Sequence, residues 1–369
     1  MSKTEKPESE LPTPDSYALV SAEAKSIDAP VLDYAPPMPR DKSIGIGLIG
    51  AGGISFAHLD AYKTHGLRVV AIADRHLDRA QARRDAYYPE AQATDQIEDV
   101  LGNPEIPVVD ITVHAKDRVA LMQRALEAGQ HVLSQKPFVQ DLAVGRELVA
   151  LAGRKGLQLA VNQNGRWAPH LSYIREAVSA GLVGAVTGVH VSIQWDHTWI
   201  AGTPFAEMAH VILDDFAIHW FDFLVSIIGD RAEQVFATAS RAAGQTIRSP
   251  LLSQAMVSFP GGQASLVFDA NATYGASDTT VVVGTRGTVR SAGPDLGHQD
   301  VSLYTAEGVA RPSLTGRWFN DGFAGTMGAL LRAIETGKEP IHSARGNLAA
   351  LRLSQAAIES TRSGAPVRI

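Results

Sequence analysis

The stretch Gly45-Ile46-Gly47-Leu48-Ile49-Gly50-Ala51-Gly52-Gly53-Ile54-Ser55 decides the first half of the fold. Its apolar start predicts a buried strand, and its glycines predict a tight turn. The residues after the glycines predict the beginning of a helix. A second apolar run, 68–73, ends at Asp74. Strand, glycine turn, helix, strand and terminal acid are together typical of the first unit of a dinucleotide-binding fold.

Each position in the glycine turn has a physical reason. Gly50 permits the sharp exit from the strand, and Gly52 has no side chain, so a pyrophosphate can approach the backbone. The N–H groups around Gly53 and Ile54, where the helix begins, would then face the phosphates. The third fingerprint position is Ser55, which is small enough for the helix to pack near the strand. A glycine-rich turn without any ligand is the alternative interpretation of this stretch.

The acid at the end of the second strand bears on the choice of cofactor. Asp74 follows Gly50 at about the spacing of the carboxylate that binds the adenosine ribose hydroxyls. A carboxylate there repels a 2′-phosphate, so the sequence favours NAD over NADP. The adjacent Arg75 would contact the same part of the cofactor and soften that preference.

Composition excludes several other classes of protein. The 369 residues carry a formal net charge of -6, which argues against nucleic acid or an anionic membrane as a partner. There is no cysteine, so disulfides, thiol catalysis and cysteine-ligated metal sites are excluded. We find neither a signal peptide nor a membrane-spanning stretch, and expect a cytoplasmic protein.

Residues 1–42 form a proline-rich N-terminal arm that differs from the rest of the chain. One interpretation is a disordered tail. The other is an arm docked on a neighbouring subunit, suggested by the apolar segments 17–20 and 31–34. The sequence slightly favours an arm that is at least partly docked.

Strands alternate with helices over residues 43–164, which predicts a doubly wound parallel sheet, the Rossmann arrangement. Ligands bind beyond the carboxyl ends of such strands, where Asp74, His114 and Lys136 all fall. The predicted elements after Asp74 are a helix to Ala86, a strand over 106–113, a helix over 118–128, a strand over 131–134, a helix over 142–153 and a strand over 158–162.

The pattern changes to strand-like alternation in the second predicted domain, residues 165–369. We expect an α+β domain with a large, mostly antiparallel open sheet. Hairpin turns are predicted at 261–262 and 284–287. The strands are predicted near 185–196, 234–240, 253–259, 263–270, 278–284 and 287–291, and closing helices over 323–336 and 346–361.

Four motifs in this order resemble the Gfo/Idh/MocA family, the relatives of glucose–fructose oxidoreductase and inositol dehydrogenase. The resemblance covers roughly residues 43 to 365, and the motifs are specific in combination. They are Gly50-Ala51-Gly52-Gly53-Ile54, Ala125-Leu126-Glu127-Ala128-Gly129-Gln130-His131-Val132, Gln135-Lys136-Pro137 and Asp215-Phe216-Ala217-Ile218-His219-Trp220-Phe221-Asp222.

Three departures from the family pattern stand out. Gln135 replaces the usual Glu of Glu-Lys-Pro, and Ala217 replaces the usual Gly of Asp-x-Gly-x-His-x-x-Asp. The family's Thr-Pro…His segment reads Val113-His114…Arg118 here. Cofactor contacts are expected from Gln135 and Lys136 and from His114, whose loop, 113–118, departs from the family pattern.

Asp215 and His219 are four residues apart, so on a helix they share one face. The helix is otherwise so apolar that a buried, ion-paired structural role is the plainer alternative, and we assign that role to Asp222. Oxidation of a secondary alcohol needs a group that removes the hydroxyl proton, for which histidine is suited. The resemblance implies His219 as acid/base, Lys136 holding the substrate oxygen and Asp215 orienting them.

A metal held by Asp215, His219 and His197 is a lesser alternative to this metal-free site. Substrate contacts are expected from Arg166 and Trp167, after the last parallel strand, and from Asp196, His197 and His219. The indoles of Trp195 and Trp199 would suit the C–H faces of a sugar, although core or interface positions suit them as well.

The sequence therefore predicts an NAD(P)-dependent oxidoreductase that moves a hydride between nicotinamide and a secondary hydroxyl of a sugar, polyol or glycoside. Two alternatives remain: a lyase or glycosidase that oxidises its substrate transiently, and a non-catalytic nucleotide-binding protein. The resemblance further implies a homodimer or homotetramer.

Overall fold

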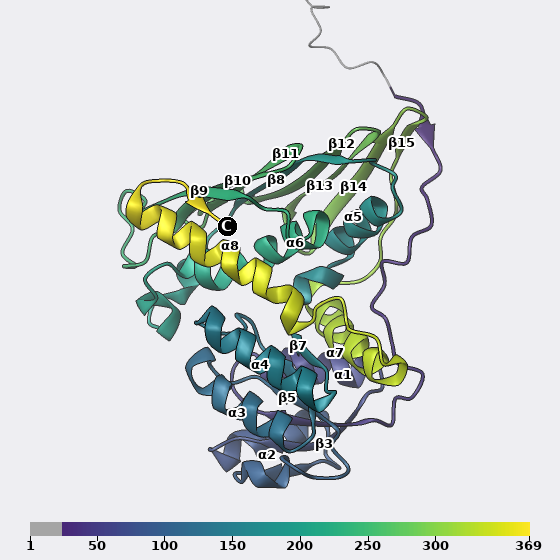
Figure 1. Cartoon of the computed structure of the whole chain (residues 1–369), viewed down its shortest axis with the longest axis vertical. Coiled ribbons are helices and arrows are strands. Elements are labelled where there is room, and N and C mark those ends of the chain that lie inside the picture. The colour runs from purple at the N-terminus through teal and green to yellow at the C-terminus, as the bar shows by residue number, and fades with distance from the viewer. Residues whose placement is uncertain (1–23) are drawn as a thin grey trace, which may run out of the picture.

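The first half of the chain is built around a six-stranded parallel sheet with helices on both faces, which confirms the predicted Rossmann arrangement (Figure 1). The computed structural model describes residues 24–369. Because both faces are covered, its central strands are continuous apolar runs. In sheet order the strands are β4 (Gln92–Thr94), β3 (Arg68–Ala73), β2 (Gly45–Ile49), β5 (Val108–Ile111), β6 (His131–Ser134) and β7 (Leu159–Val161).

Four helices connect these strands. Helix α4 is a clear case of local encoding: the Asp141 side chain caps its first turn by accepting from Ala143 N, and Gly156 ends it in the left-handed conformation. The helices are α1 (Ser55–Thr64), α2 (Leu77–Tyr87), α3 (Ala115–Glu127) and α4 (Leu142–Lys155).

The second half contains a ten-stranded, mostly antiparallel sheet, also as predicted. Among the described strands of this sheet, two neighbouring pairs, β8 with β11 and β1 with β15, run parallel. In sheet order the strands are β1 (Ser26–Ile27), β15 (Gly308–Ala310), β14 (His298–Thr305), β13 (Gly287–Asp295), β12 (Ser277–Gly284), β8 (Val186–Gln194), β11 (Gly262–Asp269), β10 (Leu252–Phe259), β9 (Gln234–Ser240) and β16 (Val367–Arg368).

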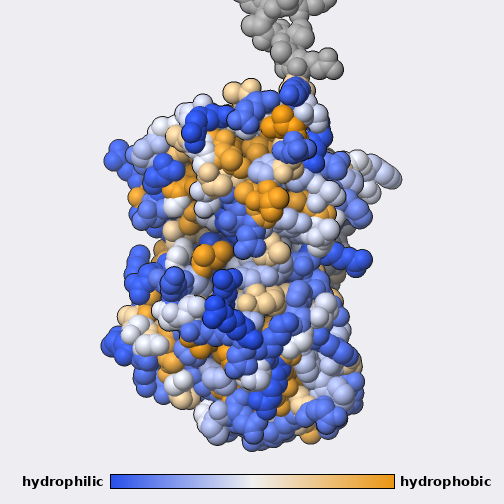
Figure 2. Space-filling view, turned by 90° about the vertical axis from the view of Figure 1, so that its right-hand side faces the viewer, coloured by the Kyte–Doolittle hydropathy of each residue, from blue (hydrophilic) through white to orange (hydrophobic). Residues whose placement is uncertain are grey.

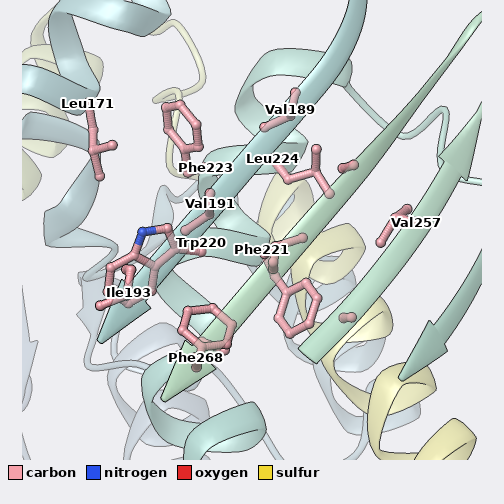
Figure 3. Close-up of a cluster of buried hydrophobic side chains, with 14 of the residues drawn as sticks. Leu171, Val189, Val191, Ile193, Trp220, Phe221, Phe223, Leu224, Val257 and Phe268 are labelled. Atoms are coloured by element: carbon pink, nitrogen blue, oxygen red, sulfur yellow. The ribbon is translucent and has the colours of Figure 1, made fainter. Parts of the chain in front are cut away.

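Helices cover one face of this sheet and bury a large apolar core against it (Figure 3). Val189, Val191 and Ile193 of β8 face Trp220 and Phe221 of α6, and all five are at most 2% exposed. The alternation of buried and more exposed residues along β8 explains this directly. The helices of this half are α5 (Pro169–Ser179), α6 (Ile218–Ile228), α7 (Trp318–Thr336) and α8 (Ala344–Ser363).

Helix α7 returns to the first half and packs against α1 (Figure 1). Its glycines permit this approach: a Cβ on Gly325 would lie 2.3 Å from the ring of Trp167, and one on Gly322 2.6 Å from the carbonyl oxygen of Asn164. The two halves are thereby joined beside the carboxyl ends of the parallel strands. Figure 2 shows a mixed surface in which the largest apolar patches lie over the half that contains the large sheet.

The described part of the N-terminal arm docks on its own chain. Strand β1 pairs with β15, the Tyr173 hydroxyl donates to the Pro30 carbonyl, and the backbone of Asp41 donates to Glu335 of α7. Tyr34 also packs edge-on against Tyr173. Segment 31–34 therefore contacts its own subunit in this structure, whereas segment 17–20 lies outside the described residues.

The sequence pattern did not predict strands β14 and β15 or helix α5. Both predicted hairpins are confirmed by the pairings of β10 with β11 and of β12 with β13. Within residues 24–369, no helix combines the length and the apolar character that crossing a membrane would require.

Candidate active site

The glycine loop between β2 and α1 forms an open cradle. Gly50 has φ +107, and a Cβ there would lie 2.8 Å from Val113, so this position requires glycine. A Cβ on Gly52 or Gly53 would meet nothing within 4 Å, so the space in front of both backbones is free. Gly53 is exposed and Ile54 half-buried at the start of α1. The loop thus offers bare backbone next to a helix N-terminus, which fits a pyrophosphate.

Asp74 stands where the predicted ribose ligand should be. Its carboxylate accepts from Ala51 N at 2.8 Å and from His76 N at 2.9 Å, which ties the end of β3 to the glycine loop. Arg75 is exposed beside it, and so is His114, which begins the turn into α3. Asp74, Arg75 and His114 all lie at the carboxyl ends of the parallel strands. Their contacts with a cofactor stay predictions.

Arg83 of α2 braces the glycine loop, although no motif in the sequence points to it. Its guanidinium donates to Ser55 Oγ at 2.9 Å and to Gly52 O at 3.1 Å. It also lies 5.9 Å from the ring centroid of Phe56. The several arginines of this solvated helix gave no sign of which one turns inward.

Lys136 and Asp215, which are 79 residues apart, meet across the two halves of the chain. Lys136 Nζ lies 2.9 Å from Asp215 Oδ2 and donates to the Asp215 carbonyl oxygen, also at 2.9 Å. Each side chain is 19% exposed, so the pair remains accessible. This brings together two of the three predicted catalytic residues.

The segment with Asp215 and His219 differs from the single regular helix that was predicted. Ile212–Phe216 forms a π-helical turn, and α6 begins only at Ile218. Asp215 thus lies in the π turn and His219 in the first turn of α6. Such turns insert an extra residue and re-aim side chains, and they recur at functional sites.

The surroundings of His219 disfavour its protonated form. Burial lowers its pKa well below the usual value, and the positive charge of Lys136 lowers it further. Its Nδ1 atom has no hydrogen-bond partner among the described residues, and its ring packs edge-on against Trp318 at 5.9 Å. The unprotonated imidazole is the form that a general base requires.

Arg118, whose position departs from the family pattern, is buried beneath Lys136. It donates to the main-chain carbonyl of Gln135 and, at 3.3 Å, to that of Lys136. Burial lowers its pKa to about 10, while the charge of Asp215 acts in the opposite direction. Arg118 therefore supports the main chain at Gln135 and Lys136.

Around His197 lies the predicted aromatic region. The indole N–H groups of Trp195 and Trp199 both donate to His197 Nδ1, each at 3.2 Å. Its pKa is lowered to about 4, chiefly by burial, and it also responds to the charges of Asp215 and Lys136. Trp199 is 62% exposed, and Asp196 is exposed with its carboxylate bound to Thr198.

Arg166 and Trp167 lie inside the protein. The Arg166 guanidinium forms a two-point ion pair with Asp222, Nε to Oδ2 at 2.6 Å and Nη2 to Oδ1 at 2.9 Å, and Nη1 donates to Ile341 O at 2.6 Å. Trp167 is 2% exposed. The structure thus places Asp222 in the predicted internal pair and gives Arg166 a partner other than substrate. Their predicted substrate contacts remain untested.

Across residues 24–369, no three histidine or acidic side chains are arranged to hold a metal ion. The alternative metal site on Asp215, His219 and His197 thus receives no support from the geometry of the described residues.

Two family models match this chain. The oxidoreductase family model described as an NAD-binding Rossmann fold, GFO_IDH_MocA, matches residues 44–163, and the GFO/IDH/MocA C-terminal domain matches residues 171–290. The chain belongs to this family. Its members are oxidoreductases with an NAD-binding Rossmann domain.

Curated members of the family resemble the chain over most of its length. An inositol 2-dehydrogenase of Rhizobium meliloti is 28% identical over 86% of this chain and 97% of its own. A D-apiose dehydrogenase of Paraburkholderia graminis is 29% identical over 87% and 88%. An oxidoreductase from Agrobacterium radiobacter, solved with NAD+, L-tartaric acid and magnesium, shares the fold with a TM-score of 0.79 at 21% identity, covering 88% of this chain and 98% of that one.

Proposed function

We propose that this protein is an NAD-dependent dehydrogenase that oxidises a secondary hydroxyl group of a sugar, polyol or glycoside. The observation that carries the proposal is the ion pair of Lys136 with Asp215 beyond the carboxyl end of β6, with His219 in the first turn of the helix that follows Asp215. The curated relatives act, by their names, on inositol and on D-apiose, both of which carry secondary hydroxyls.

The residues on the cofactor side fit NAD. The free space before Gly52 and Gly53 suits a pyrophosphate, and the Asp74 carboxylate suits the two ribose hydroxyls while repelling a 2′-phosphate. When bound there, NAD supplies the acceptor for the hydride that leaves the substrate carbon.

On the substrate side, Lys136 would donate a hydrogen bond to the reacting oxygen. Asp215 fixes the ammonium at 2.9 Å and keeps it aimed, since the same lysine also donates to the carbonyl of Asp215. His219 would take the hydroxyl proton, because its lowered pKa leaves the imidazole neutral at physiological pH. The positive charge of Lys136 stabilises the developing oxyanion, so both residues favour alcohol oxidation.

Sugar recognition would come from the loop that follows β8. Trp199 is fixed through His197 and exposes most of its ring, which suits the apolar face of a sugar. Asp196 and His197 would hydrogen-bond hydroxyls. The homodimer or homotetramer and the cytoplasmic location expected from the sequence remain proposals of the same kind.

A screen of inositols, sugars and glycosides with NAD and NADP, followed by the absorbance of reduced cofactor, tests the proposal. Lys136→Met and His219→Asn should each lower kcat/KM by about 100-fold or more while NAD still binds. Lys155→Met, at an exposed lysine on α4, is the matched control and should behave as wild type. Full turnover in either active-site variant refutes the assignment, and product release without net NADH would indicate a lyase or glycosidase.

A further inference from the structure

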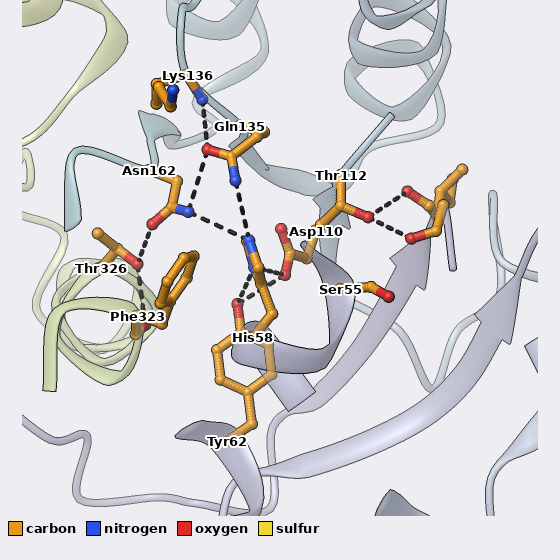
Figure 4. Close-up of polar contacts among 12 residues, drawn as sticks. Ser55, His58, Tyr62, Asp110, Thr112, Gln135, Lys136, Asn162, Phe323 and Thr326 are labelled. Atoms are coloured by element: carbon orange, nitrogen blue, oxygen red, sulfur yellow. Dashed lines mark hydrogen bonds and ion pairs between the residues drawn. The ribbon is translucent and has the colours of Figure 1, made fainter. Parts of the chain in front are cut away.

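A chain of buried hydrogen bonds runs from helix α1 to Lys136 (Figure 4). His58 lies in α1, three residues after Ser55, and its ring is wholly buried. On one side, His58 Nδ1 is 2.7 Å from Asp110 Oδ2. On the other side, His58 Nε2 is 3.3 Å from the amide nitrogen of Gln135. The proposed mechanism assigns no part to these contacts.

One obligatory donor fixes the direction of the whole chain. The backbone N–H of Lys136 donates to Gln135 Oε1 at 2.7 Å, so the other end of that amide, Nε2, faces His58. An amide nitrogen can only donate, so His58 Nε2 must accept. The single ring proton is therefore on Nδ1 and is donated to Asp110. His58 is thus a neutral imidazole in one defined tautomer.

The Asn162 amide continues the network in the same direction, and the Thr326 hydroxyl beside it also lies 2.9 Å from the Phe323 carbonyl oxygen. Asn162 Nδ2 lies 3.2 Å from His58 Nε2 and 3.2 Å from Gln135 Oε1, while its Oδ1 accepts from Thr326 Oγ1 of α7 at 2.8 Å. Two amides thus point N–H groups at one imidazole nitrogen. The network joins α1, the ends of β6 and β7, and α7, beside the carboxyl ends of the parallel strands.

We propose that His58 is a positioning residue for Lys136. His58 accepts a hydrogen bond from the Gln135 amide, and Gln135 in turn accepts one from the main chain of Lys136. The position of Lys136 relative to α1 is thereby fixed. This role rests on the proposed function, in which α1 carries the cofactor phosphates and Lys136 carries the substrate oxygen. Hydride transfer requires correctly placed atoms, so the position of Lys136 relative to α1 should affect turnover more than cofactor binding.

Because Gln135 replaces the usual glutamate of the family motif, the proposed role of His58 as an acceptor can be tested by restoring that glutamate. A glutamate at position 135 would present an oxygen to His58 Nε2, and two facing acceptors require a second proton on the ring. In wild type, nitrogen NMR should therefore find His58 neutral with its proton on Nδ1. In Gln135→Glu, it should find His58 protonated on both nitrogens. This readout does not depend on any substrate.

Two substitutions separate the two sides of the ring. His58→Asn places an amide donor near Asp110 but leaves Gln135 without its acceptor. His58→Gln places an acceptor near Gln135 but removes the donor to Asp110. We expect His58→Asn to lower kcat by roughly 10- to 100-fold with the Kd for NAD within threefold of wild type, and His58→Gln to keep most of the turnover.

Tyr62→Phe is the matched control, because the Tyr62 hydroxyl donates to the same Asp110 oxygen at 2.6 Å and lies 3.3 Å from His58 Nδ1, on the side of the ring away from Gln135. It should lower the urea midpoint and leave kcat unchanged. Equal turnover in the Asn and Gln variants, or a wild-type His58 with its proton on Nε2, overturns the proposal. If wild type oxidises no sugar in the screen, the proposed function fails, and the NMR result still decides the tautomer.

Discussion

Replacing Asp278 by asparagine should stabilise the protein, and the gain should grow with pH. Asp278 lies on β12 opposite Ile193, on the face of the large sheet that the helices cover. It is 2% exposed, and neither carboxylate oxygen has a hydrogen-bond partner among the described residues. Burial, together with the charge of Asp295, raises its pKa to about 7.

The size of the effect follows from the pKa difference between folded and unfolded chain. The folded value of about 7 against an ordinary 3.8 is a shift of about three units, and each unit corresponds to about 1.4 kcal/mol. Since the folded state binds the proton more tightly, its stability falls as pH rises from about 4 to about 7 and then levels off. An asparagine at this position has no proton to lose, so the advantage of the variant approaches about 4 kcal/mol at pH 8.

Urea unfolding of wild type and Asp278→Asn at pH 4, 6 and 8 measures this difference directly. Asp300→Asn, at an exposed carboxylate on the nearby strand β14, is the control and should change stability little at any of these pH values. A stability difference between Asp278→Asn and wild type that stays constant from pH 4 to pH 8 would show that the buried carboxyl has found a partner or water, and would refute the reasoning.

Two further substitutions test predicted substrate residues. Arg166→Met breaks the buried pair with Asp222 and should cost about 3–5 kcal/mol of unfolding free energy, with the sugar KM nearly unchanged while the enzyme is folded. A large rise in KM at an unaltered urea midpoint would instead make Arg166 a substrate ligand. Trp199→Ala should raise the sugar KM about two- to tenfold at constant kcat, through loss of ring stacking. If Trp199→Ala leaves KM unchanged but the variant has a smaller oligomeric mass in solution than wild type, Trp199 lies at a subunit interface.

Local patterns were sufficient to predict the parallel sheet and most of the large sheet. Period-two alternation along β8, and the hairpin glycines at 261–262, each encode their element within a few residues. The approach of Lys136 to the family's Asp–His motif follows from the rule that strand ends gather ligands. Strand β14 was missed because its buried residues, Val301 and Leu303, stand among polar neighbours.

The fine geometry of the site depends on contacts between distant parts of the chain. Helical periodicity put Asp215 and His219 on one face, yet the π turn separates them into two elements, and nothing local marks such a turn. Arg166 follows a strand end like a ligand, but Asp222, 56 residues later, takes its guanidinium. Only the packed structure can show which buried partner a charged side chain finds.

Two departures from the family motif belong together physically. Arg118, at the place of the usual histidine, and Gln135, at the place of the usual glutamate, touch through the Gln135 carbonyl. The side chain of residue 135 faces His58 and the Lys136 amide instead, so Arg118 contacts the main chain of this residue and not its exchanged side chain. Asp215 binds Lys136 at 2.9 Å, and its charge partly offsets the effect of burial on Arg118. Arg118 therefore supports the lysine–aspartate pair through the main chain of residue 135, while the Gln135 side chain acts on His58.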